Sequence, residues 1–309
     1  MNKNIDSNES SVSVISNNAT KSRIERVMNI IFIVCGLAAV ISVIFMTVYM
    51  VVSGGPIIAK VGFFKFILGR AWNPDNNEFG ILPMITGSIF AAGSAVLIAL
   101  PIGVLVAVFL AKLVPGKLTS SLGFLVNLLS GIPSVVYGLL GAILVVPAVF
   151  KLQEAVGVPM SGSLLAAIVI LVIMILPTII SVSETAIQAV PKAYEDASLA
   201  LGATKLQGIF NVTLPAAKSG IVAGAVLGTG RAIGEAMAVI MVAGNAAIMP
   251  ALLRPVRLLT ASIPIEWAYS SGLHRDALYG IGLVLFVFIM IINILLNGVL
   301  KKGGDFYNR

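Results

Sequence analysis

The stretch LGTGRAIGEAMAVIMVAG, residues 227–244, is almost wholly small or apolar, yet it contains Arg231 and Glu235. A run of this length is typical of a helix within lipid, where a charged side chain costs at least ~2.5–3.5 kcal/mol. We therefore expect both charges to face the interior of a helical bundle or a polar cavity. Since positions i and i+4 share one face of a helix, the spacing also predicts that Arg231 and Glu235 can pair.

The composition of the whole chain indicates a membrane protein. Of its 309 residues, 58% are hydrophobic and 11% are charged, and the mean hydropathy is +1.04, whereas soluble domains carry about 25% charged residues. The net charge of +7 is spread over short segments between apolar runs, which argues against nucleic-acid binding. Cys35 is the single cysteine, so neither a disulfide within the chain nor a cysteine metal site is possible, and we expect it to pack among apolar neighbours.

Six segments are long enough to cross a bilayer as helices. Because these apolar runs are too long and uniform for barrel strands, the sequence predicts an all-α integral membrane protein with six transmembrane helices. Pro101, Pro133 and Pro177 are expected to bend the second, third and fourth of them. The segments lie near residues 28–53, 83–111, 121–149, 163–187, 219–244 and 278–300.

Lysines and arginines set the expected orientation. With the N-terminus in the cytoplasm, twelve of the 20 fall in inner segments, seven in outer segments and one, Arg231, within a span. This bias favours cytoplasmic N- and C-termini. The predicted organisation is a flexible, Ser- and Asn-rich tail over 1–27, a first helix with an outer loop over 28–82, a transmembrane core over 83–300, and a short tail over 301–309.

The longest inner loop, residues 188–218, contains AVPKAYEDASLALGATKLQGIFNVTLPAAK. Pro191 is typical of a helix start, and Glu195 and Asp196 follow in the first turn, where acids favour the helix dipole. Gly202 is expected to bend the chain before a second helical stretch over residues 203–212, which the Leu-Pro pair at 214–215 ends. The loop therefore predicts two short helices on the membrane surface; a solvated connector is the alternative.

The spacing within this loop resembles the "EAA" loop of ABC importer permeases. Asp196, Ala197 and Ser198 stand at its acidic-small-small positions, Gly202 follows after three residues, and Leu214 and Pro215 close the pattern. The departures are Asp for Glu and Ser for the second Ala. The resemblance implies that these residues, with Glu195, form the coupling segment that docks into a groove on an ATPase subunit.

A wider resemblance covers roughly residues 60–300. GIPSVVYGLLGA (131–142), the loop above and GTGRAIGEAMAVIMVAGN (228–245) are similar in order and spacing to the PstC-type permease of phosphate ABC importers. This resemblance implies the type I permease architecture and inorganic phosphate as the solute. It also implies three partners: a second homologous permease, a cytoplasmic ATPase dimer and an extracytoplasmic phosphate-binding protein.

Two interpretations of Arg231 and Glu235 remain open. Either they form a buried ion pair that fixes helix packing, or they line the solute path, where arginine offers a fork of donors to an oxyanion. The resemblance favours the second interpretation, with Ser134 contributing a hydroxyl. Glycines 220, 224 and 228, and 230 and 234, are spaced by four and predict close helix approach. Glu184 is expected to snorkel or cap, and His274 to be solvated.

Signatures of catalysis are absent from the sequence. No GxxxxGK[ST] phosphate loop occurs, and GTGRAIG has Ile233 at the third glycine position of a dinucleotide motif. With one histidine and one cysteine, we expect no catalytic residue, metal site or cofactor, and ATP hydrolysis by a partner. Rival hypotheses are a permease for another oxyanion, the sister phosphate permease, an ATP-independent transporter and a membrane-embedded enzyme.

Overall fold

The computed structural model describes residues 6–304, with side chains over residues 25–296 except 116, 117 and 120. The chain divides into two compact units, residues 1–53 and 54–309, each described here by itself. Helix α1 (Asp6–Val61) begins inside the segment predicted as a flexible tail. No glycine or proline interrupts the chain before Gly36, so nothing in the backbone stops this helix earlier. Residues 1–5 and 305–309 lie outside the described part.

The described part of the first unit is a helix with an apolar surface. Phe32 and Phe45 are 66% and 71% exposed. Cys35 is exposed too, on the same apolar helix. Apolar side chains exposed all round a helix are typical of a segment whose surroundings are lipid or another subunit rather than water.

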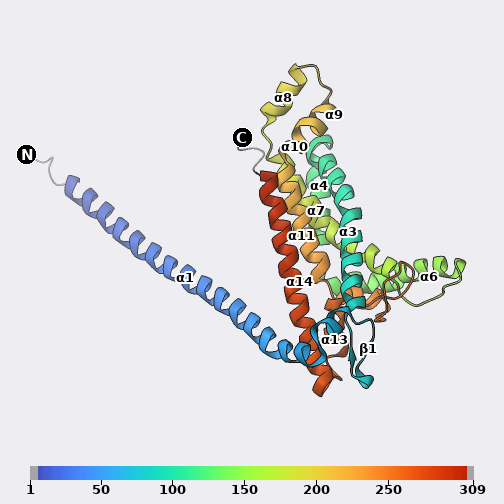
Figure 1. Ribbon diagram of the computed structural model, residues 1–309. Coiled ribbons are helices and arrows are strands. Elements are labelled where there is room, and N and C mark those ends of the chain that lie inside the picture. Colours follow the sequence, from blue (N-terminus) through green and yellow to red (C-terminus); the bar gives the residue numbers. More distant parts are fainter. Residues whose placement is uncertain (1–5, 305–309) are drawn as a thin grey trace, which may run out of the picture. The chain divides into compact units, whose positions relative to one another are not determined.

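Four long helices run side by side in the second unit: α3 (Leu82–Val108), α7 (Leu164–Gln188), α11 (Lys218–Gly234) and α14 (Gly272–Gly304) (Figure 1). By length and composition, the described residues contain five membrane-spanning helices. The number is six when Lys205–Ala216 and Lys218–Gly234, which meet at 68°, are counted as one span. The predicted all-α membrane fold with up to six spans is confirmed.

Helix α7 is the centre of the core and packs against both α3 and α11. It begins where the Ser163 hydroxyl accepts a hydrogen bond from the Ala166 N–H at 3.1 Å, which satisfies one of the free donors of a helix start. Leu171, Ile175 and Ile179 are fully buried. This burial on several sides explains why the sequence of α7 is the most continuously apolar of the spans.

Glycines bring α11 close to α7. A Cβ atom added at Gly228 would lie 2.9 Å from Cγ1 of Ile179, and Gly220 and Gly224 are similarly close to Ala186 and Val182. The predicted small-residue packing of this set is therefore confirmed. Gly230 and Gly234 do not share it, because a Cβ at either would meet no described atom within 4 Å.

The third predicted span is interrupted. Helix α4 (Gly116–Ser130) ends before Pro133, which has φ −58° and ψ 141° and so cannot continue the helix. The chain resumes as α5 (Ser134–Leu140), the π-helix η3 (Gly141–Val145) and α6 (Val146–Ala155). The prediction of one helix over 121–149 is wrong because the bend at Pro133 is a complete break.

The fifth predicted span, residues 219–244, is also broken. Helix α11 ends at Gly234, Glu235 is extended with φ −74° and ψ 127°, and a separate helix α12 (Met237–Val242) follows. Irregular backbone at membrane depth is tolerated where protein surrounds it or where it lines a cavity. This break therefore identifies a specialised part of the bundle.

One end of the bundle carries a small β-hairpin. Trp72 of β1 (Trp72–Asn73) pairs with Phe79 of β2 (Glu78–Phe79), and Phe79 is buried with Phe66 and Leu278. This cluster joins the hairpin to α14. We call this end of the bundle the hairpin end. The other short elements here are α2 (Phe63–Leu68), the 3₁₀-helix η1 (Pro74–Asn76) and α13 (Leu259–Glu266).

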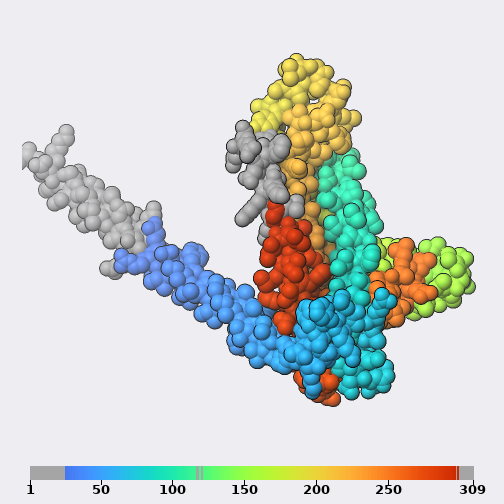
Figure 2. Space-filling view, in the orientation of Figure 1, coloured from blue at the N-terminus to red at the C-terminus, as the bar shows by residue number. Residues whose placement is uncertain are grey.

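The opposite end carries residues 188–218, and we call it the loop end (Figures 1 and 2). The loop residues, yellow and gold in Figure 2, project beyond the long helices. They form α8 (Lys192–Ala200), α9 (Lys205–Gly208), the π-helix η4 (Ile209–Thr213) and α10 (Leu214–Ala216); a further π-helix, η2 (Phe109–Leu113), ends the α3 span here.

Candidate functional site

Arg231 lies in the last turn of α11 and points toward α7. Its Nη1 donates to the Thr178 hydroxyl at 3.3 Å, and its side chain is half-buried. Its positive charge also lies near the side chain of Tyr137 in α5. A guanidinium has five N–H donors. Among the described residues Thr178 accepts one of them, so four are available to another partner.

Glu235 does not pair with Arg231, and the predicted i,i+4 contact is wrong. Because α11 ends at Gly234, the two residues no longer share a helix face. The Glu235 carboxylate instead accepts the Ala238 N–H at 3.0 Å, and its carbonyl accepts the Thr260 hydroxyl at 2.8 Å. In the described residues the ion pairs are Lys112–Glu195, Arg257–Glu266 and His274–Glu266. Glu235 therefore holds the break between α11 and α12.

Ser134 is the first residue of α5 and is half-buried. One turn later, the Tyr137 hydroxyl donates to the Leu129 carbonyl of α4 at 2.7 Å. This hydrogen bond fixes the start of α5 against the end of α4. Since Tyr137 also lies near Arg231, the break at Pro133 and the end of α11 belong to one region of the bundle.

At the loop end, Glu195 joins three elements. Its carboxylate forms an ion pair with Lys112 of η2 and accepts the Thr213 hydroxyl of η4 at 3.1 Å. Burial alone would raise the pKa of Glu195. The hydrogen bond and positive charge of Lys112, with smaller contributions from Thr213 and Lys205, outweigh burial and hold the pKa below its ordinary value of 4.5.

The turn between the two loop helices is built as the sequence predicts. Gly202 has φ +89°, a conformation that favours glycine. Thr204 then caps α9: its hydroxyl accepts the Gln207 N–H at 3.3 Å, while the Gln207 side chain accepts the Thr204 N–H at 2.8 Å. Nearby, Gly208 leaves room for the Ser198 hydroxyl, which donates to the Glu195 carbonyl at 2.8 Å.

Leu214 and Pro215 do not end the second loop helix, and that prediction is wrong. The helix continues as α10 to Ala216. The π-helix η4 ends at Thr213, directly before α10, and Pro215 occupies the first turn of α10, where its missing N–H is tolerated. The actual turn into α11 comes at Ala217.

Large apolar side chains cover the outside of this loop. Leu201, at the tip, is 90% exposed. Of the acidic-small-small triad, Asp196 and Ala197 are exposed, whereas Ser198 is buried against the second helix. Four further residues of the set are between 42% and 55% exposed: Tyr194, Leu199, Leu206 and Phe210. An apolar patch of this kind on a projecting loop is typical of a protein-binding surface.

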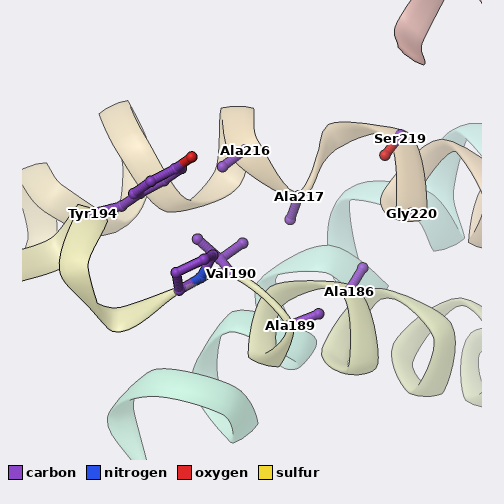
Figure 3. Close-up of a pocket in the computed structure, with 9 residues that line it drawn as sticks. Ala186, Ala189, Val190, Tyr194, Ala216, Ala217, Ser219 and Gly220 are labelled. Atoms are coloured by element: carbon purple, nitrogen blue, oxygen red, sulfur yellow. The ribbon is translucent and has the colours of Figure 1, made fainter. Parts of the chain in front are cut away.

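A cavity of about 360 Å³ lies at the base of the loop, where small side chains leave space between the end of α7 and the start of α11. Figure 3 shows Tyr194 and Val190 on the side of α8, with Ala216 and Ala217 facing them. The sequence analysis did not single out this cavity. Its signal is the group of small residues Ala216, Ala217, Ser219 and Gly220, which Lys218 interrupts.

A second polar centre, at the hairpin end, was also missed. Glu266 is only 6% exposed. Its carboxylate pairs with Arg257, accepts the Trp72 Nε1–H at 3.0 Å and lies 2.7 Å from Nε2 of His274. The expectation of a solvated His274 is therefore wrong. Because these partners are far apart in sequence, no local pattern could have revealed the centre.

Comparison with known families identifies the chain. Residues 99–302 match the family described as binding-protein-dependent transport system inner membrane component. The chain is similar to the phosphate transport system permease protein PstC of Mesorhizobium japonicum (34% identity, 74% of this chain and 76% of that protein). A probable ABC transporter permease of Bacillus subtilis is 35% identical over 84% of this chain and 87% of that protein.

Solved structures share the fold. The methionine ABC transporter MetNI in an inward-facing conformation has a TM-score of 0.52 at 23% identity, over 72% of this chain and 94% of that chain. A bacterial alginate ABC transporter in complex with its alginate-bound periplasmic protein has a TM-score of 0.54 at 15% identity, over 84% and 93%. The chain is thus a multi-pass protein of the cytoplasmic membrane with an ABC importer permease fold, and it belongs to the family of binding-protein-dependent transport system inner membrane components.

Proposed function

We propose that this chain is one permease subunit of an ATP-driven importer that moves inorganic phosphate across the cytoplasmic membrane. The observation that carries this proposal is the guanidinium of Arg231. It lies at the end of an apolar span, and one of its five donors is used by a described residue, Thr178. Planar guanidinium donors match the oxygens of phosphate and bind them with charge-assisted hydrogen bonds.

The similar proteins support phosphate as the solute. The relatives of Mesorhizobium japonicum and of two Xylella fastidiosa strains are named phosphate transport system permease proteins, at 34% identity over 74–78% of this chain. Under this proposal Arg231 binds the anion, and the Ser134 hydroxyl lines the path beside it. Glu235 has the different task of fixing the broken helix, since its carboxylate bonds to the backbone of α12.

The partners follow from the two ends of the bundle. We infer that an ATPase dimer docks on the loop end, where Leu201 and its apolar neighbours are exposed. Under this proposal the loop lies in the cytoplasm, in agreement with the distribution of lysine and arginine, which favours cytoplasmic termini. A phosphate-binding protein then delivers the solute at the hairpin end, and a second homologous permease completes the enclosure of the path. The chain contributes no ATP-hydrolysing site of its own.

The test is uptake of labelled phosphate by proteoliposomes that hold this chain, the second permease and the ATPase, with binding protein outside and ATP inside. Arg231→Gln keeps an amide donor but removes the charge and the fork, so uptake should fall at least about tenfold. The control is Lys151→Gln, which removes an exposed charge in α6 and should leave uptake unchanged.

Assembly and ATP hydrolysis are measured in the same preparations. Uptake that requires ATP and is lost in Arg231→Gln, with the complex intact, supports the proposal. Normal uptake by Arg231→Gln would show that the residue is structural. Uptake that persists without the ATPase would make the chain an ATP-independent transporter instead.

A further inference from the structure

A polar cavity of about 730 Å³ opens at the loop end between α4, η2 and the last turns of α7. It is larger than the cavity of Figure 3 and lies among helices that the sequence identifies as apolar. Its polar lining consists of Thr119 and Asn127 of α4 with Ser181, Glu184, Thr185 and Gln188 of α7. Polar side chains at membrane depth face a water-filled space or the interior of a bundle, because lipid cannot satisfy them.

The polar face of α7 begins at the proposed phosphate site. Thr178, which accepts the hydrogen bond from Arg231, is followed at helical spacing by Ser181, Thr185 and Gln188. Positions i, i+3, i+7 and i+10 lie on one side of a helix. Polar side chains therefore lie at successive turns along one side of α7, from Thr178, which Arg231 contacts, to Gln188 at the end of the helix.

Helix α4 presents a matching strip on the other wall. Thr119, Gly123 and Asn127 follow at i, i+4 and i+8, and all three line the cavity. At its C-terminal end, α4 accepts a hydrogen bond from the hydroxyl of Tyr137, which lies near Arg231. By contrast Leu128 of α4 does not line the cavity, and it is apolar and 51% exposed. Both polar strips therefore extend from the region of Arg231 and form two walls of one cavity.

Glu184 is the one charged side chain among the described residues that line this cavity. Its carboxylate accepts a hydrogen bond from Nε2 of Gln188 at 2.9 Å. A negative charge on the wall attracts cations and repels anions, the more strongly where protein and lipid limit screening by water. An anion that leaves Arg231 in this direction is therefore not retained by the wall.

We propose that this cavity is the aqueous vestibule through which the anion leaves at the loop end, and that Glu184 hastens its release by repelling it. The statement that the departing anion is phosphate rests on the proposed function. The statement that the cavity is a hydrated passage with a negative wall rests on the polar strips and on Glu184.

The test uses single-cysteine variants of the full complex in lipid nanodiscs, where both faces are accessible. Cys35→Ser provides the background, because Cys35 is exposed. Asn127→Cys and Ser181→Cys report on the cavity, and Leu128→Cys, on the same helix as Asn127 but outside the cavity lining, is the control. Since the thiolate is the reactive form and forms only in a hydrated site, charged methanethiosulfonate reagents should modify the two cavity cysteines roughly tenfold or more faster than the control.

The sign of the charge is tested with the same variants. A cationic reagent should react with Ser181→Cys at least about threefold faster than an anionic reagent of similar size, and Glu184→Gln should abolish that preference. If the cavity cysteines react no faster than Leu128→Cys, there is no vestibule. If Glu184→Gln leaves the ratio of the two rates unchanged, the carboxylate does not set the charge of the passage.

A transport assay tests whether the cavity is the exit for the anion. Phosphate uptake by Asn127→Cys is measured before and after modification with a bulky thiol reagent, with modified Leu128→Cys as control. Uptake should be blocked only in the cavity variant; unchanged uptake after full modification would make the cavity a side pocket. Thiol reactivity needs no phosphate, so a failed accessibility test leaves the proposed function standing. If the cysteines are accessible but the complex moves no phosphate, only the identification of phosphate as the solute is overturned.

Discussion

Lys112 and Glu195 form an ion pair that ties the end of the α3 span to the first turn of α8. The pair is the one charged link between a membrane-spanning segment and the loop among the described residues. The pair connects the loop to α3 in addition to the chain connections through α7 and α11, so it is the natural place to test how firmly the loop is attached to the bundle.

The first prediction concerns this pair. Because the pKa of Glu195 is lower in the folded chain than its ordinary value of 4.5, the ionised carboxylate stabilises the fold above that pH. This stabilisation is lost as the pH falls through the lowered pKa. We expect Glu195→Gln to reduce stability by about 1 kcal/mol at neutral pH, and to flatten the loss of stability below pH 4.5.

Thermal unfolding of the purified permease between pH 7 and pH 3.5 measures both effects. Asp196→Asn is the control, because Asp196 is an exposed acid in the same turn that forms no ion pair among the described residues. Equal pH profiles for wild type and Glu195→Gln would show that the pair contributes nothing to stability.

The second prediction concerns the contact of α11 with α7. Gly228→Ala places a methyl group 2.9 Å from Cγ1 of the buried Ile179, so the helices must separate, at a cost of about 1–3 kcal/mol. Gly230→Ala enters open space on the same helix and gains about 1 kcal/mol of helix propensity. Thermal unfolding should thus rank Gly228→Ala below wild type and Gly230→Ala at or above it. The reverse order would contradict the packing described.

The third prediction concerns the exposed tip of the loop. Leu201 is 90% exposed, so Leu201→Ser should not change the stability of the permease alone. If the tip docks on the ATPase, losing this leucine should weaken association about tenfold or more. The measurement is co-purification of ATPase with permease over a range of detergent concentrations. Val156→Ser, which alters another exposed apolar residue, provides the comparison, and equal retention by both variants would remove Leu201 from the interface.

The fourth prediction concerns Glu266. Glu266→Gln leaves the half-buried charge of Arg257 without its carboxylate partner and weakens the contacts to His274 and Trp72. Breaking a buried ion pair on one side costs about 3–5 kcal/mol. We expect a large fall in thermal stability and a change in Trp72 fluorescence, measured in a Trp267→Phe background. Asp276→Asn, at an exposed acid of α14, should change neither; an intact Trp72 signal in Glu266→Gln would rule out the contact.

Much of the fold can be predicted from the sequence because its causes are local. Long apolar runs give α3, α7 and α14, and the glycine at 202 gives the turn of the loop through its positive φ. The spacing of Gly220, Gly224 and Gly228 similarly indicates the face of α11 that contacts α7.

The parts that sequence reasoning missed depend on distant partners. The break at Glu235 is held by Thr260, 25 residues further on, and an unbroken helix is the simpler expectation for so apolar a segment. Trp72 and Glu266 are 194 residues apart. In both cases the deciding hydrogen bond joins residues that only the packed fold brings together, so composition and periodicity cannot predict it.

The two π-helices at the loop end restrict insertions and deletions. Lys112 is in η2 and Thr213 is in η4, and both bind the same carboxylate, that of Glu195. A π-turn is one residue longer than the α-turn it replaces, and each residue rotates a helix by about 100°. Removing one residue from either segment would turn the side chain of Lys112 or Thr213 away from Glu195, although the contacting residues themselves would be unchanged. In this family member the number of residues in these turns is therefore under the same constraint as their chemical identity.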